Sequence, residues 1–131
     1  MVIVEDYLGI TKFQKKKKLI ESTYKGRVDK DMSFDHLAKV VDFYSNNEVN
    51  AAIIDLRQLY GSFAKVMEYL SGSFYPVAVK SGLKAQAFIL HDDLIIKHLT
   101  EKLEVITANF GIMARIFNTK EEAQEWLNSF L

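Results

Sequence analysis

The chain has 131 residues, of which 49% are hydrophobic and 26% charged, a balance typical of a folded globular protein that buries a core. Lysine plus arginine and aspartate plus glutamate both number 17, so no overall field attracts nucleic acid, and we expect no nucleic-acid partner. The chain has no cysteine, which excludes disulfides, thiolate nucleophiles and cysteine metal sites.

The sequence shows no signal for targeting, membrane insertion or a flexible linker. No apolar run approaches the roughly 20 residues of a spanning helix, and the stretch Met1–Asp6 has no basic segment followed by an apolar core. We therefore expect no integral membrane segment and a cytoplasmic protein. A single proline, Pro76, and six scattered glycines leave no linker, so residues 1–131 are interpreted as one domain.

The first part of the chain is typical of two strands and a helix. Residues 2–10 and 18–24 are rich in β-branched and aromatic side chains, which predicts a hairpin with a lysine-rich turn between them. Ser33 is then expected to cap a helix over residues 34–44, whose apolar side chains recur at spacings of three and four. This helix is expected to cover the sheet.

The stretch Asn50–Arg57 is the predicted central strand. Its apolar run Ala51–Ile54 is continuous and too short for a helix, as in strands buried on both faces. The strand is expected to end at Asp55 and Arg57. Both side chains would then lie at the carboxyl edge of the sheet, where open α/β sheets bind ligands.

Three further units follow in strand and helix alternation. Ser62 is expected to cap a helix that is interrupted near residues 71–73 and resumes at Pro76. A strand over 84–90 leads to a helix that begins at Asp92 or Asp93 and stops near Asn109 and Gly111. A last strand over 112–117 precedes a helix that Thr119 and Glu122 open with a capping box.

The resulting order ββαβαβαβα predicts an α/β fold with a mostly parallel, five-stranded sheet flanked by helices and right-handed crossovers. The closing segment Arg115–Leu127, the stretch Tyr24–Val28 and the strand Ala52–Arg57 resemble the SpoIIAA-like family of STAS/SEC14-type domains. The resemblance spans nearly the whole chain. It implies the fold of that family, while activity has to be argued from the site.

The resemblance also implies a place to look for regulation. STAS anti-sigma-factor antagonists carry a phosphorylated serine just past the central strand, and the matching region here is Leu59–Phe63. It lacks the Asp-Ser-Ser-Gly pattern, and its serine, Ser62, comes earlier. A capping role accounts for Ser62 without phosphorylation.

Few residues indicate a catalytic, metal-binding or cofactor-binding role. No phosphate-binding loop or nucleophile elbow is present, so we expect no catalytic residue, no metal and no cofactor. The alternative is a hydrolase-type enzyme that uses His91 with Asp92 or Asp93 at the end of a predicted strand. His91 and His98 are seven residues apart, which is not the spacing of two metal ligands on one helical face.

Two other functions are favoured over the hydrolase-type enzyme. The leading hypothesis is a non-enzymatic regulatory module that binds a protein partner or a second copy of itself through one face, made of Asp55, Arg57, Tyr60, Ser62, His91 and Asp92. The second is a carrier of a small apolar or lipid ligand, since the family is also similar to SEC14-type domains. Its lid would lie in residues 63–79, with the apolar side chains Phe63, Met67, Phe74 and Tyr75.

Overall fold

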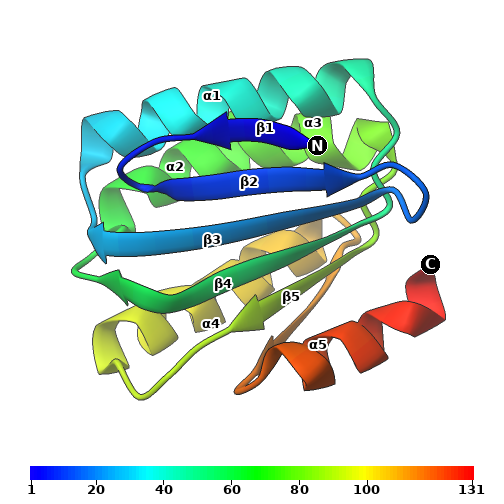
Figure 1. Cartoon of the computed structure of the whole chain (residues 1–131). Coiled ribbons are helices and arrows are strands. Elements are labelled where there is room, and N and C mark those ends of the chain that lie inside the picture. Colours follow the sequence, from blue (N-terminus) through cyan, green and yellow to red (C-terminus); the bar gives the residue numbers. More distant parts are fainter.

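Six strands lie in sequential order in one sheet of the computed structural model, which describes residues 1–131 (Figure 1). They are β1 (Val2–Glu5), β2 (Gly9–Gln14), β3 (Leu19–Arg27), β4 (Ala51–Tyr60), β5 (Ala85–Ile89) and β6 (Met113–Phe117). The first three strands pair antiparallel, and β3 to β6 pair parallel. The α/β class and the mostly parallel sheet are confirmed, but the sheet has six strands instead of the predicted five.

The additional strand arises because the predicted strand over residues 2–10 is wrong. Asp6 turns the chain, since its Oδ1 accepts the backbone N–H groups of Leu8 at 2.9 Å and Gly9 at 3.2 Å. Gly9 then lies so close to β3 that a Cβ there would stand 2.9 Å from the Tyr24 Cα. The predicted hairpin is formed by β2 and β3, with the lysine-rich segment 15–18 as its turn.

The helices are distributed unequally over the two faces. Right-handed crossovers between strands added in one direction all fall on the same face. Accordingly α1, the helical segment 64–81 and α4 cover one face, and only α5 covers the other (Figure 1). The helical elements are α1 (Lys30–Asn46), η1 (Ala64–Val66), α2 (Met67–Tyr69), η2 (Leu70–Phe74), α3 (Tyr75–Ser81), α4 (Leu94–Asn109), α5 (Lys120–Leu127) and η3 (Asn128–Phe130). None of these helices is both long and apolar enough to cross a membrane.

The core has a large and a small part, separated by the sheet. The large cluster contains 23 buried residues and lies under α1, residues 64–81 and α4. The small cluster contains 8 and lies under α5. Strand β4 contributes Ala52 and Leu56 to the first and Ala51 and Ile53 to the second, so this strand is buried on both faces as its apolar run predicts.

The predicted helix starts near Asp93 and at Thr119 are confirmed, and the start at Ser33 is wrong. Asp93 accepts the Ile96 N–H at 3.0 Å, and Thr119 accepts the Glu122 N–H at 3.2 Å, as the capping signals predict. Helix α1, however, begins four residues before the predicted start, because Asp29 is its N-cap and accepts the Met32 N–H at 2.9 Å. Ser33 therefore lies inside the first turn.

The helical segment after β4 changes its pitch without breaking. Residues 70–74 form a turn of π-helix between α2 and α3, and Pro76 lies in the first turn of α3. The predicted interruption near residues 71–73 is thus a widened turn. Such turns occur often at functional sites.

Candidate functional site

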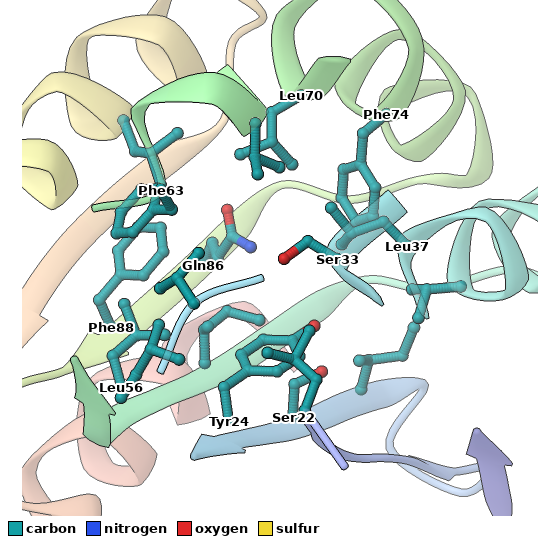
Figure 2. A pocket seen from close by; sticks show the side chains of 18 of the residues that line it. Ser22, Tyr24, Ser33, Leu37, Leu56, Phe63, Leu70, Phe74, Gln86 and Phe88 are labelled. Atoms are coloured by element: carbon teal, nitrogen blue, oxygen red, sulfur yellow. The ribbon is translucent and has the colours of Figure 1, made fainter. Parts of the chain in front are cut away.

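A partly open cavity of about 100 Å³ lies in the large core, between the sheet and the helices above it (Figure 2). Its floor comes from β3, β4 and β5, and its walls come from α1 and from residues 63–75. Twenty residues line it, of which 17 are hydrophobic and none carries a charge. Cavities of this composition bind apolar molecules.

The residues predicted as an apolar lid lie mostly in the cavity wall. Phe63, Phe74 and Tyr75 are buried and line the cavity, together with Leu70. Met67 does not line it, because it is half-buried and packs against the outside of the core cluster. We call residues 63–81 the lid segment.

Only three of the lining residues are not hydrophobic, and Gln86 is one of them. It lies on β5 with 2% exposure, and its Oε1 accepts the Tyr75 hydroxyl proton at 2.9 Å. Its Nε2 makes no hydrogen bond within the protein. Every fully enclosed side-chain nitrogen or oxygen has a partner, so Nε2 is in contact with the open space of the cavity. Figure 2 shows the Gln86 amide in the middle of the lining side chains.

Ser33 and Ser22 are the other two polar side chains of the wall. The Ser33 hydroxyl donates its proton to the Asp29 carbonyl oxygen at 2.6 Å. The Ser22 hydroxyl lies 2.8 Å from the Thr11 hydroxyl. Both side chains are thus held by other parts of the protein.

Ser22 belongs to a buried polar chain that continues to His36 and Asp6. His36 Nε2 lies 2.8 Å from Thr11 Oγ1, and His36 Nδ1 lies 3.0 Å from Asp6 Oδ2. Burial lowers the pKa of His36, and the Asp6 carboxylate opposes this only in part. The neutral imidazole then donates from Nδ1 to Asp6 and accepts the Thr11 proton at Nε2, so Thr11 accepts the Ser22 proton.

This chain has the order of a hydroxyl, an imidazole and a carboxylate, as in nucleophilic hydrolases. Its hydroxyl, however, belongs to Thr11, which is fully buried and does not line the cavity. Thr11 separates the His36 imidazole from Ser22 and from any molecule in the cavity. The arrangement joins β2, β3 and α1 and fixes Ser22.

Asp55 and Arg57 form a pair within β4. The predicted end of this strand is wrong, because β4 continues to Tyr60 with a bulge that sets Lys25 opposite Gln58. Arg57 Nε donates to Asp55 Oδ1 at 3.0 Å, and its terminal Nη2 donates to Oδ2 at 2.7 Å. Burial raises the pKa of Asp55, but the hydrogen bonds and charge of Arg57 outweigh this, and the net pKa is lowered.

The other residues of the predicted interaction face are more dispersed. His91 lies close enough to Asp55 to contribute to its lowered pKa. Tyr60 and Asp92 are exposed and make no side-chain hydrogen bond to this group. Ser62 accepts the Ala64 N–H at 3.2 Å, but the residue at the N-cap position is Phe63, so the predicted cap is wrong by one residue. The structure thus pairs Asp55 with Arg57, while Tyr60, Ser62, His91 and Asp92 lie at exposed positions.

No group of three His, Asp or Glu side chains comes together as ligands for a metal ion. Asp93 is engaged in the cap of α4, which removes one carboxylate from the alternative with His91. The sequence analysis also missed Gln86, Ser22 and the position of Ser33 in the cavity wall. The only sequence signal for Gln86 is that it is the one polar residue in the otherwise apolar run of residues 85–90.

Comparisons with known proteins give structural similarity only. The chain matches no family model and no curated protein. Among solved structures it is similar to an uncharacterized protein of the DUF3478 family from Shewanella loihica, described as having a SpoIIAA-like fold. The identity is 20%, the TM-score is 0.49, and the alignment covers 83% of each chain.

The buried His36 predicts a dependence of stability on pH. Since its pKa is lower in the folded than in the unfolded chain, the unfolded chain binds more protons between these two values. The free energy of unfolding should therefore fall as the pH falls from 6.5 toward the pKa of the folded state. Asp6 and Lys39 are the charged groups that act on His36.

Urea unfolding at pH 7.5 and 5.5, followed by Trp126 fluorescence, measures this loss. His36→Gln should show a smaller loss than the wild type, whereas His98→Gln, at an exposed position of α4, should keep the full loss. An equal loss in the wild type and His36→Gln would contradict the assignment.

Proposed function

We propose that this protein is a non-enzymatic binding module of the STAS type that holds a small, uncharged, mainly apolar molecule in the cavity of its large core. The observation that carries the proposal is the wall of the cavity, with 17 hydrophobic residues among 20 and no charged side chain. Apolar lining with a few placed polar groups is the usual composition of small-molecule sites.

The absence of charge in the wall restricts the ligand. A carboxylate or ammonium group moved into this cavity would lose its hydration without gaining a counter-charge, at a cost of several kcal/mol. The polar headgroup of a lipid therefore does not fit inside. An engineered cavity of roughly 150 Å³ holds benzene, so the cavity at about 100 Å³ takes a smaller body unless the lid segment moves outward.

The lid segment has features that support such movement. Leu70 and Phe74 face the cavity from the π-helical turn, whereas Gly72 between them is exposed. A side chain at Gly72 would meet no atom within 4 Å, so this turn is not packed against a neighbour on its outer side. An outward shift of the turn would enlarge the cavity at the cost of few outer contacts.

The non-enzymatic part of the proposal follows from the state of the reactive groups. His36 is closed off behind Thr11, and Asp55 is paired with Arg57. A general base must reach the proton that it abstracts, within about 3.2 Å or through one water. Neither group lines the cavity, so neither can act on a molecule bound there.

A cavity-filling variant tests this function. Val66 lines the cavity, so Val66→Phe should fill it, raise the free energy of unfolding by about 1 kcal/mol and prevent ligand uptake. Xenon-induced shifts of methyl resonances report uptake. In the wild type they should cluster on side chains around the cavity, and in Val66→Phe they should disappear.

Val105→Phe is the matched control, since it makes the same change at a position of α4 with 65% exposure. It should keep the wild-type shifts. Xenon shifts that are absent from the wild type, or that persist in Val66→Phe, would contradict ligand binding in this cavity.

A second function, binding of a protein partner or of a second copy through the carboxyl end of the sheet, is favoured by a different observation. Large apolar side chains are exposed there: Leu94 by 80%, Ile95 by 55% and Tyr60 by 52%. Exposed apolar groups of this size mark interaction surfaces when they gather.

Self-association is the form of this function that is tested most directly. Sedimentation velocity over a range of concentrations should detect a dimer in the wild type, and the double variant Tyr60→Ala with Leu94→Ala should weaken it about tenfold or more. Val105→Ala, on the outer side of α4, should leave it unchanged. A wild type that stays monomeric at all concentrations would exclude association of two copies.

A further inference from the structure

One side chain of the cavity wall has a hydrogen-bond donor that the protein leaves unused. Gln86 on β5 is 2% exposed, and its Nε2 makes no hydrogen bond within the protein, although it is in contact with the open space of the cavity. Figure 2 shows this amide nitrogen directed toward the space between the lining side chains. We propose that the ligand of the cavity is a small, uncharged carbonyl compound whose oxygen accepts a hydrogen bond from Gln86 Nε2. This inference rests on the proposed function of the cavity.

The Tyr75 hydroxyl sets the orientation of the amide. It donates its proton to Gln86 Oε1 at 2.9 Å, and both side chains are 2% exposed, so the core encloses this hydrogen bond. Burial raises the pKa of Tyr75, which keeps its hydroxyl protonated and able to donate. The oxygen of the amide is therefore engaged by the protein, and the nitrogen is the atom left for a ligand.

The side chains around Gln86 cannot supply the missing acceptor. In the register of the sheet, Gln86 lies between Ala52 on β4 and Ala114 on β6. Phe88 is the next residue of β5 on the same face, and Phe74 lines the cavity from the lid segment. All four side chains are apolar and have no oxygen to offer to an N–H group. Since buried donors are generally paired, the partner of this one has to come from a bound molecule.

A carbonyl group fits this donor better than other polar groups do. Its oxygen accepts a hydrogen bond and brings no proton that would need an acceptor of its own among the apolar side chains. A carboxylate also accepts, but it would carry a charge into a wall in which no lining residue is charged. An ammonium group offers only donors, which Gln86 Nε2 cannot accept. The ligand class is thus ketones, esters or tertiary amides with a compact apolar body.

A matched pair of probes isolates the carbonyl oxygen. Cyclobutanone and methylenecyclobutane have the same small ring, which suits a cavity of about 100 Å³, and differ only in whether oxygen or a methylene group is attached to it. Each probe is titrated against the isotopically labelled wild type by NMR. The side-chain amide protons of Gln86, assigned through their own side-chain couplings, should move downfield with cyclobutanone. They should move much less with methylenecyclobutane, which cannot accept a hydrogen bond.

Dissociation constants give a second readout. Gln86→Met keeps the length of the side chain and removes the amide, but it leaves the Tyr75 hydroxyl without its acceptor. The comparison is therefore made between Tyr75→Phe and the double variant Tyr75→Phe with Gln86→Met. The dissociation constant of cyclobutanone should be about tenfold higher in the double variant, because one hydrogen bond to the ligand is lost. That of methylenecyclobutane should not rise.

Gln58→Met is the matched control, since it makes the same change at an exposed position of β4. It should alter neither dissociation constant. The wild-type amide shifts do not depend on how well the variants fold, so they test the inference by themselves.

The outcomes separate the two claims. If both probes bind and shift the Gln86 amide protons equally, or if cyclobutanone binds Tyr75→Phe and the double variant equally, the carbonyl inference is overturned and the apolar cavity function stands. Binding of methylenecyclobutane alone has the same meaning. If neither probe binds the wild type, the proposed function itself fails.

Discussion

The direction in which the sheet grows determines where this protein has room for a ligand. Strands β3 to β6 are added one beside the next, and right-handed crossovers place α1, the lid segment and α4 on a single face. On that face the sheet is covered by two long helices, α1 and α4, and by the lid segment, which mixes 3-10, α and π turns. The cavity lies where the straight helix α1 and the irregular lid segment meet above β3, β4 and β5.

The opposite face is organised by different interactions. There α5 alone covers part of the sheet, over the small cluster with Ala51, Ile53 and Leu127. The pair Asp55 and Arg57 belongs to β4 at the edge of this covered region, and Glu121 of α5 acts on Arg57. This charged pair thus lies on the face of the sheet that carries α5, away from the cavity.

The polar groups of the cavity wall are held by hydrogen bonds, as buried polar groups generally are. Each is fixed by a second residue: Gln86 by Tyr75, Ser33 by Asp29, and Ser22 by Thr11. A side chain that is held in one orientation binds a ligand without a large loss of rotamer freedom. The polar chain through His36 extends this support from Ser22 to Asp6.

Sequence patterns predicted the elements whose signals are local. The run Ala51–Ile54, the cap at Asp93 and the capping box at Thr119 depend on neighbours within a few residues, and the structure confirms them. The Asp6 turn was missed because the apolar residues around it continue the pattern of a strand. Ser33 and Asp29 are both good caps, and only the packing of α1 decides between them.

The site was harder to predict than the fold. Periodic aromatic residues placed Phe63, Phe74 and Tyr75 in the lid, and they line the cavity. The polar groups opposite them come from β3, α1 and β5, so their proximity depends on the sheet register, which the sequence does not display. For the same reason the length of β4, and with it the position of Asp55 and Arg57 inside the strand, was not foreseen.

Native mass spectrometry of the protein isolated from its own host tests the central claim most directly, because one spectrum reports both subunit number and bound small molecules. The account predicts a fraction of the protein with a non-covalent, neutral added mass, which collisional activation removes and which Val66→Phe does not carry. A spectrum that contains only the mass of the bare chain, even after exposure to a cell extract, would contradict ligand binding in the cavity.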